Sequence, residues 1–144
     1  MTTVNLHPRR AARQCVLEAL FAYQFSKNER MEIINQLLNR NPRLNDHYDF
    51  IKSLFDTVLI KMDWTEKIIK AHLENWELDR VASIDKILLK MGICEIYFIN
   101  DIPPKVTITE MVEIAKIYST DESPIFINGI LDSVFKDYLK ENKE

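Results

Sequence analysis

Apolar side chains recur along this chain at the spacing that places them on one face of a helix. In residues 9–25 the apolar positions of one face are Ala12, Val16, Ala19, Leu20 and Tyr23. The same spacing recurs in residues 31–39, 50–62, 68–73, 81–98, 107–118 and 123–139. Spacings of three and four residues are typical of amphipathic helices. The pattern therefore predicts an all-α fold, a bundle of about seven helices.

Helix ends are predicted where residues that break or cap helices interrupt this spacing. Pro8 lies just before the first helix, Asn41-Pro42 closes the second, and Ser123-Pro124 opens the last. The candidate N-caps between them are Asp46 or His47, Asp63 or Thr65, Asp79, and Thr107 or Thr109. Residues 26–29 are expected to form a turn, and residues 140–144 a frayed, charged tail.

Residues 81–98 carry apolar side chains around most of the helix circumference, so this segment is predicted to be the central helix. Gly92 inside it costs about 1 kcal/mol relative to alanine, and we expect close approach of another helix as the reason for it. Glu95 falls on the apolar side of the helical wheel. It is therefore predicted to be a buried carboxylate that meets a hydrogen-bond donor from elsewhere in the bundle.

The composition fits a single domain spanning residues 1–144. The two glycines argue against an all-β fold and exclude both a Gly-rich phosphate loop and a dinucleotide fingerprint. No apolar run is long enough to span a membrane, and the first residues show no secretory signal pattern. A cytoplasmic protein is expected, with Cys15 and Cys94 as reduced thiols in or near the core.

Catalytic and metal-binding residues are not predicted from the sequence. The three histidines are scattered, and no H-E-x-x-H, CxxC or nucleophile-elbow motif is present. We therefore expect that the protein is not an enzyme and needs no cofactor.

Positive charge gathers at the N-terminal end, although the net charge is −3. Arg9, Arg10 and Arg13 precede the first acidic residue, Glu18. On a helical wheel Arg10, Arg13, Leu17 and Phe21 lie away from the apolar face. Two interpretations remain open: the helix is buried on two faces, or the arginines pair with RNA phosphates while the Phe21 ring stacks on a base.

A second informative stretch is residues 101–131, DIPPKVTITEMVEIAKIYSTDESPIFINGIL. Pro103 and Pro104 predict a break, which two helices and a short polar connection follow. Tyr118 ends one helix, and Phe126, Asn128 and Gly129 lie in the first turns of the next. Tight helix packing around Gly129 is one interpretation. The other is that Tyr118 or Phe126 stacks on bases while Asn128 bonds to a base edge or to the RNA backbone.

The pattern DIP-x-KV-x-I-x-E-x-VE-x-AK followed by F-x-NG-x-LD resembles the C-terminal signature of the NusB family of transcription antitermination factors. The run RRAARQCVLEALFAYQ is similar to the arginine-rich first helix of that family, with Ala11 where some members have a further arginine. The resemblance implies a compact fold of two packed helical subdomains. It also implies that Arg9, Arg10, Arg13 and Phe21 bind boxA RNA and that the region of Tyr118, Phe126 and Asn128 shares in binding.

The function implied by the resemblance is transcription antitermination on ribosomal RNA operons. The expected partners are boxA-containing single-stranded RNA, the small-subunit ribosomal protein NusE, and the RNA polymerase antitermination complex. A helical module that binds only protein is the alternative. A NusB-like domain of an RNA cytosine methyltransferase would need several hundred further residues.

Overall fold

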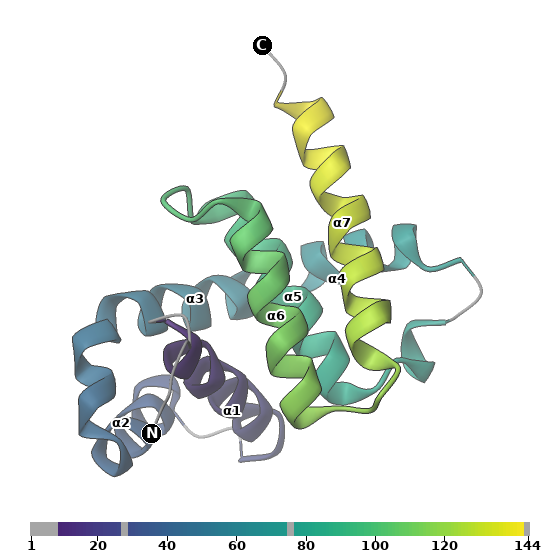
Figure 1. The fold of residues 1–144 in the computed structure, drawn as a ribbon. Coiled ribbons are helices and arrows are strands. Elements are labelled where there is room, and N and C mark those ends of the chain that lie inside the picture. The colour runs from purple at the N-terminus through teal and green to yellow at the C-terminus, as the bar shows by residue number, and fades with distance from the viewer. Residues whose placement is uncertain (1–8, 27–28, 75–76, 143–144) are drawn as a thin grey trace, which may run out of the picture. The chain divides into compact units, whose positions relative to one another are not determined.

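The computed structural model describes residues 9–26, 29–74 and 77–142, and this part of the chain is all-α (Figure 1). The described residues form seven α-helices, namely α1 (Arg10–Ser26), α2 (Arg30–Arg40), α3 (Tyr48–Ile60), α4 (Met62–His72), α5 (Ser83–Phe98), α6 (Pro104–Tyr118) and α7 (Ser123–Glu141). Two 3₁₀ helices, η1 (Pro42–His47) and η2 (Leu78–Arg80), precede α3 and α5. The predicted fold class is confirmed.

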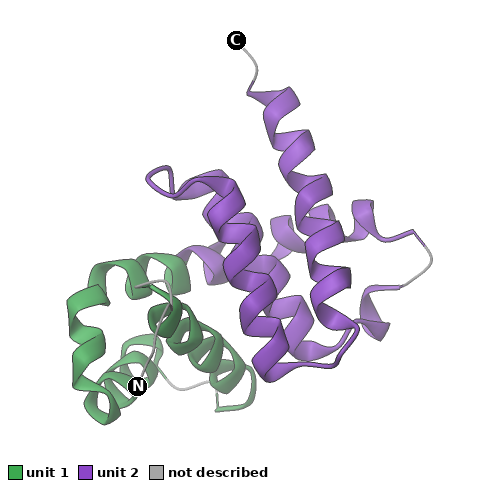
Figure 2. Ribbon diagram, in the orientation of Figure 1, with its two compact units in different colours: residues 1–56 green, residues 57–144 purple. Residues whose placement is uncertain are grey.

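The helices form two compact units, an N-terminal unit of residues 1–56 and a C-terminal unit of residues 57–144 (Figure 2). In the N-terminal unit α1 packs against α2 and η1. The predicted face of α1 is buried at Ala12, Val16, Ala19 and Leu20, and the half-buried Tyr23 lies edge-on to Phe55, with ring centroids 6.4 Å apart. These apolar contacts hold α1, which carries the arginines.

The C-terminal unit is built around α5, which packs against α4, α6 and α7. Every residue from 87 to 96 is buried, as expected of a helix with neighbours on all sides. In α7, Ser123, Leu131 and Tyr138 contact, in that order, Asp85, Gly92 and Tyr97 of α5. Because both series ascend, the two helices run in the same direction, side by side, over about three turns.

Gly92 is the glycine that close packing requires. A Cβ at this position would lie 2.7 Å from Leu131 Cδ1 and 2.9 Å from Leu131 Cδ2, closer than carbon atoms pack. The expectation for Gly92 is confirmed. Gly129 differs, because a Cβ there would meet nothing within 4 Å. The interpretation of Gly129 as a packing glycine is wrong, since its side of α7 faces open space.

Buried polar side chains in the C-terminal unit have partners. Glu95 is fully buried, and its Oε1 accepts a hydrogen bond of 2.8 Å from Thr107 Oγ1 of α6, which confirms the prediction. Lys90, nearly buried on α5, donates to Glu66 Oε2 of α4 at 2.9 Å. Each pair ties a neighbouring helix to α5.

The N-terminal ends of several helices differ from the predictions. Asp46 and His47 lie inside η1, which runs directly into α3, so neither caps a separate helix. The break between α3 and α4 falls at Lys61, ahead of the predicted one. Thr65 donates from Oγ1 to the Met62 carbonyl inside α4, and Asp63 lies in the first turn.

Two more helix starts differ from the predictions, one beside a proline and one after the second 3₁₀ helix. Asp79 lies in η2, and α5 begins only at Ser83. Pro104 opens α6, because a proline lacks the N–H that the first turn leaves without a partner. Thr107 and Thr109 are therefore inside the helix.

Asn41 and Ser123-Pro124 mark helix ends as predicted. Helix α7 continues to Glu141, through part of the expected frayed tail. Pro8 and residues 27–28 lie outside the described residues.

Both cysteines are buried free thiols, as predicted. Burial, and secondarily the nearby Glu18 carboxylate, raises the pKa of Cys15 to about 11; burial raises the pKa of Cys94 to about 12. Both thiols are thus protonated at neutral pH. Within the described ranges, no helix is long and apolar enough to cross a bilayer.

Substitution of the two glycines should have opposite effects on stability. Gly92→Val should lower the free energy of unfolding by about 2 kcal/mol, because the added carbons overpack the contact with Leu131. Gly129→Ala should raise it by up to about 1 kcal/mol, because alanine favours the helix and meets no neighbour. Chemical denaturation of both variants measures these changes. Equal destabilisation by the two would contradict the assignment of Gly92 to packing.

Candidate nucleic-acid interface

The basic end of the chain lies at the N-terminus of α1. The Arg9 carbonyl accepts the first helical hydrogen bond, from Arg13 N at 2.9 Å, so Arg9 directly precedes the helix. Arg9 and Arg10 are half-buried, and the first turn holds no acidic residue. A helix N-terminus attracts anions through its exposed N–H groups and its dipole. Two arginines therefore strengthen a field that already favours phosphate.

Phe50, near the start of α3, organises two of the arginines. The Arg9 guanidinium lies over its ring with Cζ 4.7 Å from the centroid, and Arg13 Cζ lies 5.3 Å away. Residues four apart share one helix face, so both side chains reach the same ring. Phe50 was not predicted as part of the site, because its place in the apolar pattern of α3 marks it only as a core residue.

Arg13 departs from the expectation of an RNA-facing side chain. It is fully buried, with 0% of its surface exposed. A buried guanidinium cannot meet a phosphate without rearrangement, whereas it can hold the ring on which Arg9 rests. Leu17 is buried too, as the interpretation of α1 as a helix buried on two faces requires.

Phe21 remains at the surface of α1, with 37% of its surface exposed. Its ring meets that of Phe25, 71% exposed, edge-on at a centroid distance of 5.0 Å. The face of α1 that was predicted to lie away from the apolar face is therefore buried around Leu17 and exposed around Phe21. Such an exposed pair offers ring faces suited to base stacking.

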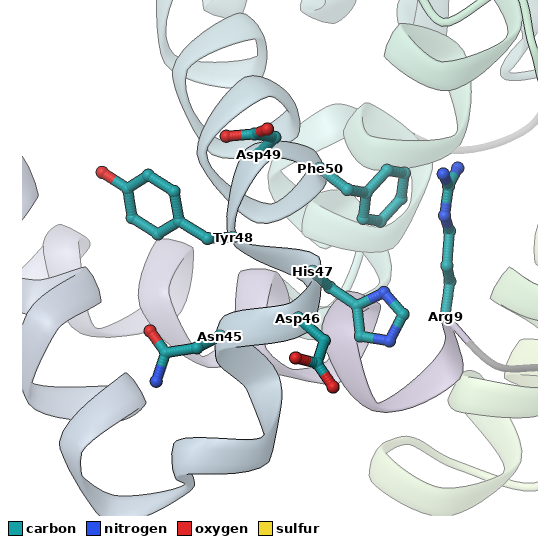
Figure 3. Close-up of a pocket in the computed structure, with 7 residues that line it drawn as sticks. All are labelled: Arg9, Asn45, Asp46, His47, Tyr48, Asp49 and Phe50. Carbon is teal, nitrogen blue, oxygen red and sulfur yellow. The ribbon is translucent and has the colours of Figure 1, made fainter.

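A cavity of about 340 Å³ opens beside Arg9 (Figure 3). Its lining consists of Arg9 together with the end of η1 and the start of α3, namely Asn45, Asp46, His47, Tyr48, Asp49 and Phe50. The lining is mostly polar and includes two carboxylates. It adjoins the arginine that Phe50 holds in place.

In the C-terminal unit, the expected RNA-binding residues lie around the connection from α6 to α7. Tyr118 is 37% exposed, Phe126 is half-buried and Asn128 is exposed. The side chains of Tyr118 and Asn128 are thus exposed enough to contact RNA, and that of Phe126 is partly exposed.

The buried Asp85 carboxylate holds this connection in place. Its Oδ1 accepts a 2.6 Å hydrogen bond from Ser119 Oγ, and its Oδ2 accepts one of 2.7 Å from Ser123 Oγ. Ser123 Oγ also lies 2.9 Å from Thr120 Oγ1. Hydrogen bonds to an ionised acceptor are shorter and stronger than neutral ones. The network therefore fixes the start of α7 against α5.

A second cavity, of about 430 Å³, lies beside Phe126. Its walls include Val81, Ile125 and the exposed Arg80. Arg80 was not predicted from the sequence, because a single arginine between acidic and apolar residues forms no recognisable pattern. The lining is mostly apolar and also includes Arg80 and the carboxylates of Asp85 and Glu122.

The described residues contain no group of three or more histidine, cysteine, aspartate or glutamate side chains that could hold a metal ion. His47 lines the cavity beside Arg9, and His72 lies between Ser133 and Asp137, with Nδ1 2.8 Å from Ser133 Oγ and Nε2 3.1 Å from Asp137 Oδ2. His7 is outside the described part of the chain.

Fold and residues together define an all-helical protein with arginines at the start of its first helix and exposed aromatic side chains of a kind that stacks on nucleic-acid bases. The sequence model of the NusB family matches residues 10–136. The protein belongs to the NusB family.

Relatives and solved structures agree with this assignment. The transcription antitermination protein NusB of Thermodesulfovibrio yellowstonii is 39% identical, with 94% of this chain and 96% of that protein aligned. The protein of the same name from a Nitratiruptor species is 35% identical, with 90% of this chain and 92% of that protein aligned.

Among solved structures, NusB of T. maritima has a TM-score of 0.78 at 32% identity, covering 91% of this chain and 92% of that one. A chain from a complex of the antitermination factors NusB and NusE with double-stranded RNA has the same TM-score at 24% identity, covering 90% and 97%. At that identity the second similarity establishes the fold.

Removal of the Asp85 carboxylate should destabilise the C-terminal unit. Asp85→Ala removes the acceptor of the buried Ser123 hydroxyl and of the half-buried Ser119 hydroxyl. The free energy of unfolding should therefore fall by roughly 2 kcal/mol or more. Asp79→Ala, at an exposed position of η2, is the matched control and should change it by less than about 0.5 kcal/mol. Urea denaturation of both variants measures the difference; equal effects would contradict the role given to Asp85.

Proposed function

We propose that this protein is a transcription antitermination factor that binds boxA-containing single-stranded RNA together with the ribosomal protein NusE. It acts within the RNA polymerase antitermination complex on ribosomal RNA operons, in the cytoplasm, and catalyses no reaction. Family membership, the shared name of the relatives, and the similarity to a chain solved with NusE and RNA support the proposal.

The main structural support for the proposal is that Arg9 and Arg13 both lie over the Phe50 ring. A long, flexible side chain loses rotamer entropy when it binds a phosphate. The ring restrains Arg9 before RNA arrives, at a cation–π gain of about 0.5–2 kcal/mol. Arg9 and Arg10 then pair with phosphates, and the buried Arg13 acts by supporting the ring.

Electrostatics limit how tightly the isolated protein can bind. Two phosphate contacts to a single strand give a slope of log K against log salt of about −1.4, or roughly sevenfold between 50 and 200 mM salt. Stacking on Phe21 adds about 1–3 kcal/mol. These contributions are modest for a protein with a net charge of −3. A partner that supplies further RNA contacts, as NusE would, accounts for tight binding.

The α6–α7 connection provides the second set of proposed contacts. Tyr118 and Phe126 stack on bases, and Asn128 bonds to a base edge or to the RNA backbone. The open space around Gly129 leaves α7 accessible to RNA beside Asn128. Asp121 and Glu122 repel phosphate, so the strand passes beside them.

Neutralisation of the half-buried Arg9 and Arg10 tests the proposal. In fluorescence polarisation with a labelled boxA RNA, Arg9→Gln with Arg10→Gln should bring the salt slope of the isolated protein from about −1.4 close to zero. Binding at about 50 mM salt should weaken at least roughly tenfold, because two charge-assisted contacts are lost.

The matched control is Arg40→Gln with Arg43→Gln, which removes the same charge from exposed positions of α2 and η1. It should leave the slope near about −1.4. If both double variants bind alike, the arginine site is wrong. If the unmodified protein does not prefer boxA over scrambled RNA even with NusE, the protein-only module is the better description.

A further inference from the structure

The cavity beside Arg9 has two different sides (Figure 3). The Phe50 and His47 rings point toward Arg9, and the Asp46 carboxylate lies below the His47 ring in this view, directed away from the Arg9 guanidinium. The side chains of Asn45, Tyr48 and Asp49 point away from Arg9. The side nearest Arg9 therefore presents a cation and an imidazole, and the Asp46 carboxylate lines the cavity beyond the His47 ring.

The charges of the lining determine what can enter. Arg9 contributes one positive charge, and Asp46 and Asp49 contribute two negative charges, so the lining has a net charge of −1. A phosphate inside would lie among carboxylates and be repelled. A neutral, planar group that donates hydrogen bonds would instead find acceptors. At about 340 Å³ the cavity is at the small end of ligand pockets, which span about 300–1,000 Å³.

We propose that this cavity binds one unpaired guanine of the RNA, an inference that rests on the proposed function. The Asp46 carboxylate accepts hydrogen bonds from guanine N1–H and N2–H. Arg9 donates to the phosphate of the same nucleotide at the cavity mouth. The half-buried His47 ring borders the base, whereas the buried Phe50 contributes by holding Arg9.

The chemistry of the four bases favours guanine. A carboxylate presents two adjacent acceptors and no donor. The Watson–Crick edge of guanine has two adjacent donors, N1–H and the 2-amino group. Cytosine and adenine each place a ring-nitrogen acceptor beside their amino group, and uracil places a carbonyl on each side of its single N–H. Only guanine can therefore pair with both carboxylate oxygens without facing an acceptor.

Inosine isolates this contact, because it differs from guanosine only by the missing 2-amino group. We would titrate the full-length protein with a guanine-containing boxA RNA and with versions in which each guanine in turn is replaced by inosine. At one position the replacement should weaken binding by the unmodified protein on the order of tenfold, the loss expected for one hydrogen bond to a charged acceptor. Asp46→Asn should bind the guanine and inosine versions equally.

Asp49→Asn is the matched control, because it removes the same charge from the same cavity at a carboxylate directed away from Arg9. It should retain the roughly tenfold preference for guanine at that position. Both aspartates are exposed, so neither variant should lower the unfolding temperature measurably.

Three outcomes would overturn the inference: an unmodified protein that binds every inosine version as well as guanine, an Asp46→Asn variant that still discriminates, or equal loss of discrimination in both variants. Weakened NusE binding with unchanged RNA discrimination in Asp46→Asn would also overturn it and assign the cavity to protein. In each case RNA binding by Arg9 and Arg10 stands, so the proposed function fails separately, only if the unmodified protein shows no preference for boxA.

Discussion

The close approach of α5 and α7 at Gly92 is the constraint on which the C-terminal unit depends. The absence of a Cβ there lets Leu131 reach the α5 backbone. About two turns earlier on each helix, the same alignment brings Ser123 to Asp85, and further along it brings the Tyr138 ring centroid within 4.9 Å of that of Tyr97. One small residue thus fixes the register of two long helices. Through Ser123, it also fixes where the first turns of α7, with Phe126 and Asn128, begin.

In the N-terminal unit the main constraint is the Phe50 ring, which lies against the guanidinium groups of Arg9 and Arg13. Phe50 is nearly buried, yet Arg9 and Arg13 both lie over it. The ring lets one arginine be interior while the other stays partly accessible. Because η1 leads directly into α3, the residues before Phe50 form the wall of a cavity beside Arg9. Core packing and the proposed RNA contacts therefore share one residue.

The sequence predicted what depends on local periodicity and fixed chemistry. The seven helices, the central position of α5, the role of Gly92 and the need of Glu95 for a hydrogen-bond donor follow from spacing, burial and the cost of a buried charge. Helix N-termini were less predictable, because 3₁₀ turns and prolines displaced the expected caps at Asp79 and Thr107. Packing is one of two interpretations that the sequence leaves open for Gly129, because the neighbours that would meet its Cβ come from the tertiary fold.

The candidate site, too, was predictable from the sequence only where it depends on local periodicity. Wheel geometry selected Arg10, Arg13, Leu17 and Phe21 as one face, but it could not tell that the middle of this face is interior. Contacts between residues distant in sequence, such as Arg9 with Phe50 and Ser119 with Asp85, carry no local signal. These contacts decide which arginine is accessible and how the α6–α7 connection is held.

We propose that RNA contacts α1 at Arg9, Arg10 and Phe21 and also contacts the connection from α6 to α7. The most direct measurement is an amide NMR titration of the full-length protein with boxA RNA. The account predicts that the largest shift changes occur at Arg9, Arg10 and Phe21, around residues 46–50, and at Tyr118, Phe126 and Asn128. Changes confined to other surfaces, such as the exposed residues of α2 and α4, would contradict it.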